Sequence, residues 1–219
     1  MDSVGGIDTA ETEYLDVVEP TGQVVGPRAR DDVHHEGAWH QVAHCMVVRS
    51  GPPARVVLQV RTTTTSTYPG RLDLTVTGHV SAGESPAEGM VREIAEEVGI
   101  AVDAEQLVPL GRRLLADDHG AIRNRELMHV YLLPDDRPLT AFPLDPAHVG
   151  GLVEITTADL LRVLADQAAR VECPATWVDG RSGHRMVGYD DLVPPMDGYW
   201  AVVTVMAERF VAGETPLAI

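Results

Sequence analysis

One short segment, residues 78–100, restricts the fold of this chain more than any other part of the sequence. It reads Gly-His-Val-Ser-Ala-Gly-Glu-Ser-Pro-Ala-Glu-Gly-Met-Val-Arg-Glu-Ile-Ala-Glu-Glu-Val-Gly-Ile. Ser85 and Glu88 have the spacing of a capping box, and Pro86 stands at the first helical position, so a helix is predicted to begin here. Apolar residues at steps of three and four then predict one buried helix face, formed by Ala87, Val91, Ile94 and Val98.

Three carboxylates occupy the other side of this helix. Glu93, Glu96 and Glu97 fall within an arc of about 100°, opposite the apolar stripe and therefore on an exposed face. Like charges at these spacings destabilise an isolated helix by about a few tenths of a kcal/mol per pair, and a divalent cation would compensate them. Gly78 and Gly83 bracket a loop before the helix whose backbone can approach a ligand closely. The segment therefore predicts a metal site.

The same segment resembles the Nudix box, and it matches that motif at every fixed position from Gly78 to Ile100. The resemblance implies an α/β (α+β) fold, an α/β/α sandwich with a mixed sheet between helices. It also implies Mg²⁺ or Mn²⁺ as cofactor and attack of a metal-activated water on a diphosphate. The roles that it implies are metal binding by Glu93, Glu97 and the Gly78 carbonyl, metal binding or water activation by Glu96, and orientation by Arg92 with Glu84.

The rest of the chain supplies alternating strand and helix patterns. Tyr14–Val18 and Gln23–Val25 flank Pro20-Thr21-Gly22 and predict a hairpin. Further strands are predicted at residues 42–48, 56–60, 72–76, 110–115 and 127–133, and helices at 85–98, 157–169 and from an N-cap at Asp197 to near Gly213. We expect an N-terminal segment over 1–33, a Nudix core over 34–170, and a C-terminal extension over 171–219 that packs on the core and ends in a helix.

Charge and composition narrow the choice of partners. The chain has 33 acidic and 17 basic residues, a formal net charge of -16. This charge disfavours nucleic-acid polymers and anionic membranes, and it repels a phosphorylated small molecule unless bound cations invert the local potential. We expect a cytoplasmic protein with no membrane span, because the chain has only two cysteines, no export signal pattern and no long apolar run. A homodimer is the expected association state.

A second resemblance extends over roughly residues 14–165, to the Nudix branch related to type I isopentenyl-diphosphate isomerase. It is carried by the hairpin, the run of residues 34–40, the Tyr68-Pro69-Gly70 turn and Gly78-His79. The positions that it implies for a second metal site are His34, His40, His79 and Glu126. The alternative is that these imidazoles simply bond backbone carbonyls.

Three departures argue against isomerase chemistry in this chain. Thr77 stands where the isomerase has its catalytic cysteine, and a hydroxyl does not replace a thiol in that proton exchange. Asn124 replaces the first glutamate of a Glu-any-Glu pair, and the Nudix box is intact. We therefore expect a pyrophosphohydrolase that acts on a nucleoside diphosphate derivative or another organic diphosphate. The alternatives are an isomerase-like enzyme and a non-catalytic regulator that binds a nucleotide or diphosphate.

Substrate contacts are expected from Arg61, His79 and Glu126. Arg61 is the first candidate for a diphosphate clamp among the arginines Arg61, Arg71, Arg123 and Arg125, because guanidinium offers bidentate donors. The threonine-rich run at 62–67 lacks the basic residue that relatives of this branch usually carry there. Specificity is expected to reside in the segments before His34 and after Val171.

Overall fold

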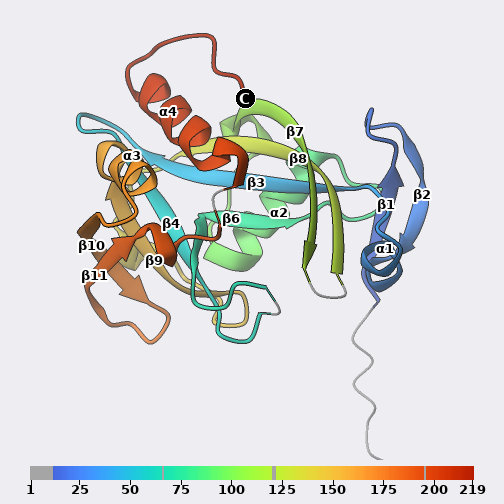
Figure 1. Ribbon diagram of the computed structural model, residues 1–219, viewed down its shortest axis with the longest axis horizontal. Coiled ribbons are helices and arrows are strands. Elements are labelled where there is room, and N and C mark those ends of the chain that lie inside the picture. The colour runs from blue at the N-terminus through green and yellow to red at the C-terminus, as the bar shows by residue number, and fades with distance from the viewer. Residues whose placement is uncertain (1–11, 66, 120–121, 195) are drawn as a thin grey trace, which may run out of the picture.

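The computed structural model describes residues 12–65, 67–119, 122–194 and 196–219. Its strands are β1 (Tyr14–Val18), β2 (Val24–Ala29), β3 (His40–Arg49), β4 (Arg55–Arg61), β5 (Leu72–Leu74), β6 (Val76–His79), β7 (Val108–His119), β8 (Ile122–Pro134), β9 (Val149–Thr156), β10 (Arg170–Trp177) and β11 (Ser182–Gly188). Its α-helices are α1 (Arg30–Glu36), α2 (Pro86–Val98), α3 (Thr157–Ala165) and α4 (Tyr199–Val211). The hairpin β1–β2 and α1 lie at one end of the molecule, and β10 and β11 lie at the other (Figure 1).

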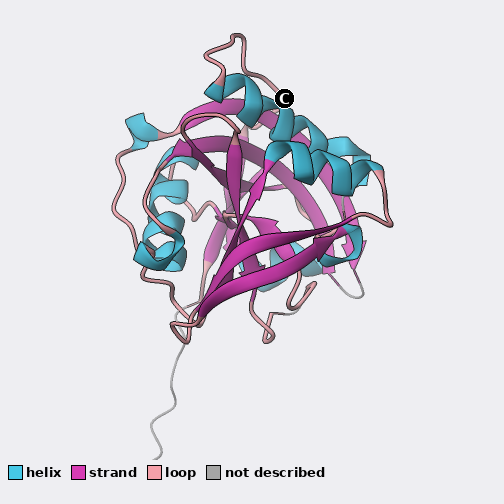
Figure 2. Ribbon diagram, turned by 90° about the vertical axis from the view of Figure 1, so that its left-hand side faces the viewer, coloured by secondary structure: helices cyan, strands magenta, loops and turns pink. Residues whose placement is uncertain are grey.

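The strands form one sheet in which β3 is the central strand. The main path runs β11-β10-β9-β4-β3-β1-β2. Strand β5 pairs with β4, β6 pairs with β3, and the hairpin β7–β8 joins the path where β8 pairs with β3. The pair β3–β8 is parallel, whereas the other registered pairs are antiparallel. Helices lie on both sides of the strands (Figure 2). The predicted mixed sheet between helices is therefore confirmed.

Both faces of the sheet are buried, which explains the continuous apolar run in β3. Met46 and Val48 pack in a core cluster that includes residues of α3 and α4. Cys45 and Val47, which point the other way, pack in a cluster that includes Met90 of α2. Because successive side chains of β3 point to opposite faces of the sheet, this one strand contributes to the hydrophobic core on each face.

The sheet divides at Thr75, and this division prepares the functional site. Before Thr75, β5 pairs with β4; after it, β6 pairs with β3. The Thr75 hydroxyl, which is fully buried, accepts a hydrogen bond of 2.8 Å from Val47 N and donates to Val57 O. One side chain therefore bridges β3 and β4 where the two strands diverge. The single strand predicted for 72–76 is in fact two short strands that fill this gap.

Local sequence signals located most elements, but three boundaries were wrong. The helix predicted to reach residue 169 ends at Ala165, because the Asp166 carboxylate accepts from Ala168 N and turns the chain toward β10. Asp197 is not the N-cap of α4: Gly198 is, and the Asp197 carboxylate pairs with Arg113 instead. Gly78 lies in β6 rather than in a loop.

Local sequence patterns predict neither α1 nor the β10–β11 hairpin. This hairpin pairs with β9 and extends the sheet. Residues 1–11 of the expected N-terminal segment lie outside the described residues. Among the described residues, no helix is both long and apolar enough to cross a membrane.

Candidate active site

The start of α2 is fixed by the capping box that the sequence predicted. Ser85 Oγ accepts from Glu88 N at 3.3 Å, and Glu88 Oε2 accepts from Ser85 N at 2.8 Å. Pro86 occupies the first turn, and Gly99 ends the helix in the left-handed conformation with φ of 68°. An added Cβ at Gly99 would also lie 2.3 Å from the Pro143 carbonyl oxygen, so glycine is required there twice over. Both ends of α2 are therefore set by local contacts.

Arg92 holds the acidic side chains of this region together. Its Nε and Nη2 donate to the two oxygens of Glu84 at 2.9 and 3.0 Å. Its Nη1 donates to Glu93 at 2.8 Å and to Glu96 at 3.1 Å, and its Nη2 also reaches the His79 carbonyl at 3.0 Å. The planar guanidinium is suited to such multiple contacts, which an ammonium group cannot reproduce. Arg92 thus fixes the relative positions of Glu84, Glu93 and Glu96.

The expectation that all three glutamates lie on an exposed face is wrong for two of them. Glu93 and Glu97 are 9% and 7% exposed, whereas the side chain of Glu96 is 47% exposed. Glu93 follows Gly89 and Met90 by one turn of α2, Glu97 follows Glu93 by another turn, and these four residues are all buried. The buried face of the helix is therefore wider than its apolar stripe and ends in carboxylates.

Gly78 makes room for one of these carboxylates. A Cβ built on Gly78 would lie 2.1 Å from Glu93 Cδ and 2.4 Å from Glu93 Oε1. Contacts this short do not occur, so any larger residue would displace the Glu93 carboxylate. The glycine that opens the motif is thus explained by close approach of a side chain to strand β6.

The two buried carboxylates are incompletely balanced: Glu93 pairs with Arg92 at 2.8 Å, whereas Glu97 has no ion pair among the described residues. Desolvation raises the pKa of Glu93, and desolvation with the negative charge of Glu93 raises the pKa of Glu97 well above its ordinary value. Glu97 Oε2 receives only long hydrogen bonds, of 3.4 Å each, from Thr77 N and Gln59 Nε2. A divalent cation with oxygen preference, such as Mg²⁺, would supply the missing positive charge, so this donor set fits such an ion.

These groups open onto a large cavity of about 980 Å³. Its lining includes the α2 side chains Arg92, Glu93, Glu96 and Glu97, the strand residues Gln59, Asp73, Thr77 and Glu126, and residues 193, 194, 197, 199 and 200 that lead into α4. Such a volume is typical of a small-molecule site. The two cysteines, Cys45 and Cys173, are buried and do not line this cavity.

The expected substrate contacts have different surroundings. Four hydrogen bonds within the chain engage all three nitrogens of Arg61, and they go to Asp73, Thr65 and Thr67. Arg61 therefore holds the threonine-rich loop. Glu126 also lines the cavity, but it makes no hydrogen bond or ion pair within the described part of the chain. Burial and the charges of Asp73 and Asp117 raise the pKa of Glu126 to about 7.

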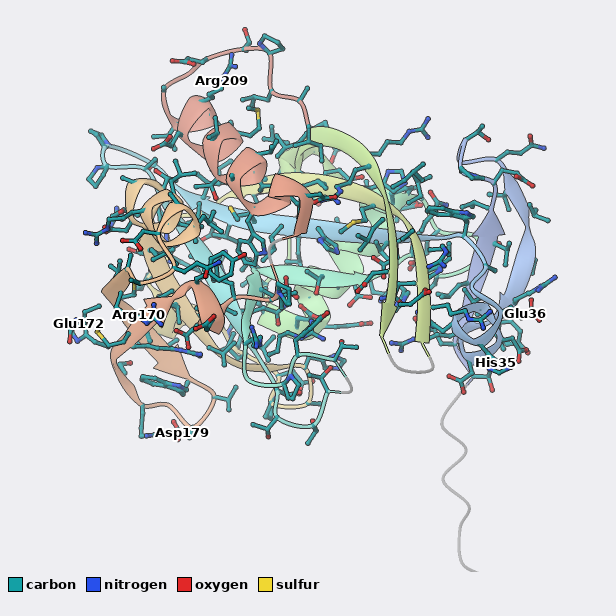
Figure 3. The ribbon with its side chains drawn as sticks, viewed as in Figure 1. His35, Glu36, Arg170, Glu172, Asp179 and Arg209 are labelled. Atoms are coloured by element: carbon teal, nitrogen blue, oxygen red, sulfur yellow. The ribbon has the colours of Figure 1, made fainter. Side chains whose placement is uncertain are left out.

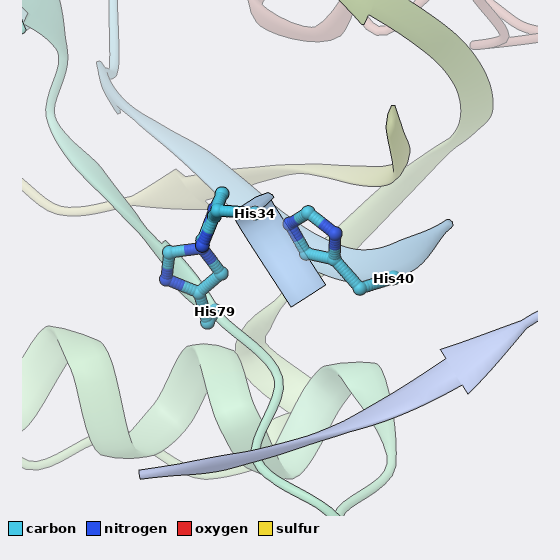
Figure 4. A group of neighbouring side chains, drawn as sticks. All are labelled: His34, His40 and His79. Carbon is cyan, nitrogen blue, oxygen red and sulfur yellow. The ribbon is translucent and has the colours of Figure 1, made fainter. Parts of the chain in front are cut away.

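Three histidines from separate elements meet beside the cavity (Figure 4). His34 on α1, His40 on β3 and His79 on β6 offer ring nitrogens that all lie within 4.8 Å of one another. His34 Nδ1 and His40 Nδ1 bond the backbone carbonyls of Arg30 and Ala38 at 3.0 and 3.1 Å. Glu126 does not belong to this compact group, although it pairs with His40 in the β3–β8 register.

These hydrogen bonds determine which histidine nitrogen carries a proton. An imidazole Nδ1 that bonds a carbonyl must donate, so in the neutral ring Nε2 carries a lone pair. Burial lowers the pKa of His34 and lowers that of His40 to about 4, so both rings are neutral near pH 7. His40 Nε2 has no hydrogen-bond partner among the described residues. The neighbouring His35 is exposed on α1 and is not in the cluster (Figure 3).

One wall of the cavity is formed by residues that no sequence motif indicates. Tyr199 Oη lies 3.1 Å from His44 Nδ1, and Arg113 lies over the Tyr199 ring with its Cζ 4.4 Å from the centroid. Burial lowers the pKa of His44 to about 4 and raises that of Tyr199 well above its usual range, so both are neutral. Alternation in β7 could have placed Arg113 with Leu115 on one face, but nothing local in the sequence links His44 to Tyr199.

Comparison with known proteins places these features in a family. A family model described as the NUDIX domain matches residues 38–172. The chain belongs to the Nudix family. An uncharacterized Nudix hydrolase of Clostridium acetobutylicum is 30% identical over 88% of this chain and 96% of the relative. An uncharacterized Nudix hydrolase of Salmonella typhi is 29% identical over 71% of this chain and 85% of the relative.

A solved structure agrees with this assignment. The crystal structure of a Deinococcus radiodurans protein aligns with a TM-score of 0.55 and 26% identity, over 72% of this chain and 92% of that one. The Nudix domain and the hydrolase relatives together identify this chain as a Nudix hydrolase, an enzyme that acts on pyrophosphate bonds in small molecules.

Proposed function

We propose that this Nudix hydrolase is a divalent-metal-dependent pyrophosphohydrolase that cleaves the diphosphate linkage of a nucleoside diphosphate derivative or another organic diphosphate. The observation that carries the proposal is the burial of Glu93 and Glu97 side by side at the cavity wall, without a cation to balance both charges. Such an arrangement is costly in a protein interior unless a bound ion neutralises it.

The site residues on β6, on α2 and in the loop between them have separate roles in this proposal. Glu93, Glu97 and the Gly78 carbonyl would hold Mg²⁺ or Mn²⁺, and Arg92 with Glu84 would keep Glu93 in place. A bound ion of this kind activates water and stabilises the charge that develops on the leaving phosphate. Glu96, the most exposed of the three, is positioned at the cavity to bind metal or to accept the proton that the attacking water loses.

The three histidines support a second metal site in the same cavity region. In His34 and His40, the hydrogen bond from Nδ1 to a backbone carbonyl leaves the lone pair on Nε2, as is usual for histidines that bind metals. Neutral imidazole favours a borderline ion such as Zn²⁺ over Mg²⁺.

This cluster is also the observation that favours a second candidate function, an isomerase-like reaction on a prenyl diphosphate. Against it, Thr77 lines the cavity where that reaction needs a thiol, and neither cysteine reaches the cavity. Incubation with isopentenyl diphosphate in deuterium oxide tests it directly, and we expect no incorporation of deuterium into the recovered substrate.

The hydrolase proposal is tested with nucleoside diphosphates, nucleotide sugars, dinucleotides and prenyl diphosphates in the presence of Mg²⁺ or Mn²⁺, in an assay of phosphate release that is coupled to a phosphatase. We expect Glu97→Gln to lower turnover by about 10³ because it removes the charge of a metal ligand at constant volume. Glu105→Gln, which removes an exposed charge outside the cavity, is the matched control and should leave turnover unchanged. Near-normal turnover in Glu97→Gln would contradict the assignment of Glu97 as a metal ligand. If the wild type hydrolyses none of these substrates, a regulator that only binds diphosphates would be favoured.

A further inference from the structure

Glu126 is a carboxylate of the cavity whose side chain has no hydrogen bond or ion pair among the described residues, a property that it shares with Asp31 and Asp117. Glu84, Glu93 and Glu96 bond Arg92, and Glu97 accepts from Thr77 N and Gln59. Asp73 pairs with Arg61 at 3.0 Å. The Glu126 side chain is half-buried and lines the same cavity. A half-buried acceptor without a donor would gain free energy from a ligand that supplies one.

Glu126 lies neither on α2 nor within the compact group of His34, His40 and His79, although its backbone is in register with His40. Asp73, Asp117 and Arg113 are the charged groups that act on its pKa. Glu126 and the α2 carboxylates line one cavity, so a diphosphate held at α2 would place its organic group in the space that Glu126 also lines.

The walls around Glu126 allow a hydrogen bond there to be strong. The neutral pair His44 and Tyr199 closes the α4 side, and apolar side chains that include Leu115 and Met128 line the cavity nearby. Because water is partly excluded, a charged acceptor in such surroundings gains more from a donor than it would in solvent. A second anionic group would be repelled by Asp73, Asp117 and Glu126.

We propose that Glu126 is a specificity-determining residue of this enzyme: its carboxylate accepts a hydrogen bond from an N–H or O–H group on the organic part of the diphosphate substrate. It thereby selects organic groups that carry donors, such as nucleobases or sugars, over hydrocarbon chains. A hydrocarbon chain would shield the carboxylate from water without offering it a hydrogen-bond donor. Binding sites with such an unpaired polar group reject the ligand that lacks the donor most strongly. The inference rests on the proposed pyrophosphohydrolase function.

The test compares wild type with Glu126→Gln on two sets of probes, with Mn²⁺ present. The first set is ADP, CDP, GDP and UDP, and the second is isopentenyl, dimethylallyl and geranyl diphosphate. We expect wild type to favour at least one nucleoside diphosphate over every prenyl diphosphate by about 100-fold in kcat/KM. Glu126→Gln should lower kcat/KM for that nucleotide by about 10- to 100-fold, mainly through KM, and change the prenyl values by less than about threefold.

Asp118→Asn is the matched control, because Asp118 is an exposed carboxylate of the same hairpin that pairs with Arg125 outside the cavity. It removes the same charge and should change neither set. A wild-type preference for prenyl diphosphates, or an equal loss on both sets in Glu126→Gln, would overturn the role of Glu126 while leaving the hydrolase proposal intact.

Binding measurements separate the two proposals if turnover is absent. Calorimetric titration of the Mn²⁺-loaded protein with the four nucleoside diphosphates should show weaker binding in Glu126→Gln than in wild type by the same 10- to 100-fold factor, about the worth of one hydrogen bond to a charged group. Such a difference without any hydrolysis would support Glu126 and remove the pyrophosphohydrolase. Equal affinities in the two proteins would remove the role of Glu126.

Discussion

Replacement of Gly78 by alanine tests the metal-site geometry directly. Gly78 lies in β6 and has no positive φ, so its backbone accepts alanine without strain. The new Cβ would start 2.1 Å from Glu93 Cδ, whereas ordinary contacts begin at 3.4 Å, so the Glu93 carboxyl carbon must retreat by 3.4 minus 2.1, or 1.3 Å. Metal–ligand distances tolerate only about 0.2 Å, so Glu93 should no longer bind the ion.

The size of the effect follows from this displacement. Misplacement of a catalytic group by about 1 Å costs on the order of 100-fold in rate, so we expect Gly78→Ala to lower kcat/KM by at least about 100-fold and to weaken Mn²⁺ binding comparably. Overpacking should cost about 1–3 kcal/mol of stability, a loss of several degrees in Tm that leaves the protein folded at 25 °C. Calorimetric Mn²⁺ titration and thermal unfolding measure the two effects separately.

Two further variants isolate the cause. Gly183→Ala places the same methyl group in β11, where the nearest atom is 3.8 Å away, and should leave turnover and Mn²⁺ affinity unchanged. In a Glu93→Gln background, where the ligand charge is already lost, Gly78→Ala should cost little more, so the two changes should be strongly non-additive. Turnover within about threefold of wild type in Gly78→Ala alone would refute the reasoning.

Three other outcomes follow from the contacts. Arg92→Lys should lower kcat by about 10- to 100-fold because one ammonium cannot hold several carboxylates at once; steady-state kinetics measure this. Mn²⁺ affinity should fall as pH drops through the raised pKa values of Glu93 and Glu97, which must lose their protons to bind it, and titrations from about pH 8 to about pH 5 should show this. Thr75→Val should cost about 2–4 kcal/mol in urea unfolding, because Val47 N loses its buried acceptor.

The pH prediction has a counterpart in the metal-free protein. A carboxyl group whose folded pKa lies above its unfolded pKa binds more protons in the folded state. Its contribution therefore stabilises the fold at low pH and is lost as pH rises through the folded pKa. Without metal, the Glu93 and Glu97 pair should make stability decrease from acid toward neutral pH, and saturating Mn²⁺ should reverse that trend.

Local signals in the sequence carried much of the fold and part of the site. The capping box and helical period of α2 were predictable because each depends on residues within one or two turns. The burial of Glu97 was not, because periodicity assumes that the buried face is apolar. Here the buried face extends to carboxylates that look into a cavity formed by distant strands.

Longer-range features were beyond any local reading. The hydrogen bond between His44 and Tyr199 joins residues separated by 155 positions. The β10–β11 hairpin contains Pro174 and several glycines, which local rules assign to loops, yet cross-strand pairing with β9 holds it in the sheet. Arg61 looked like a free cation in the sequence, and only the folded loop shows that Asp73 and two threonines occupy its donors.

The two proposed metal sites differ in ligand chemistry in a way that bears on how they would be filled. Carboxylates near Glu93 attract hard ions that are abundant, whereas the neutral rings of His34, His40 and His79 favour scarce borderline ions that bind nitrogen tightly. Protons compete differently as well: the pKa of His40 is about 4, so acidification should empty the carboxylate site first. A titration at mildly acidic pH that still loads Zn²⁺ on the histidines, while Mn²⁺ no longer binds at Glu93, would demonstrate that the cavity contains two independent sites. Simultaneous loss of both ions would mean instead that the histidines and carboxylates share one.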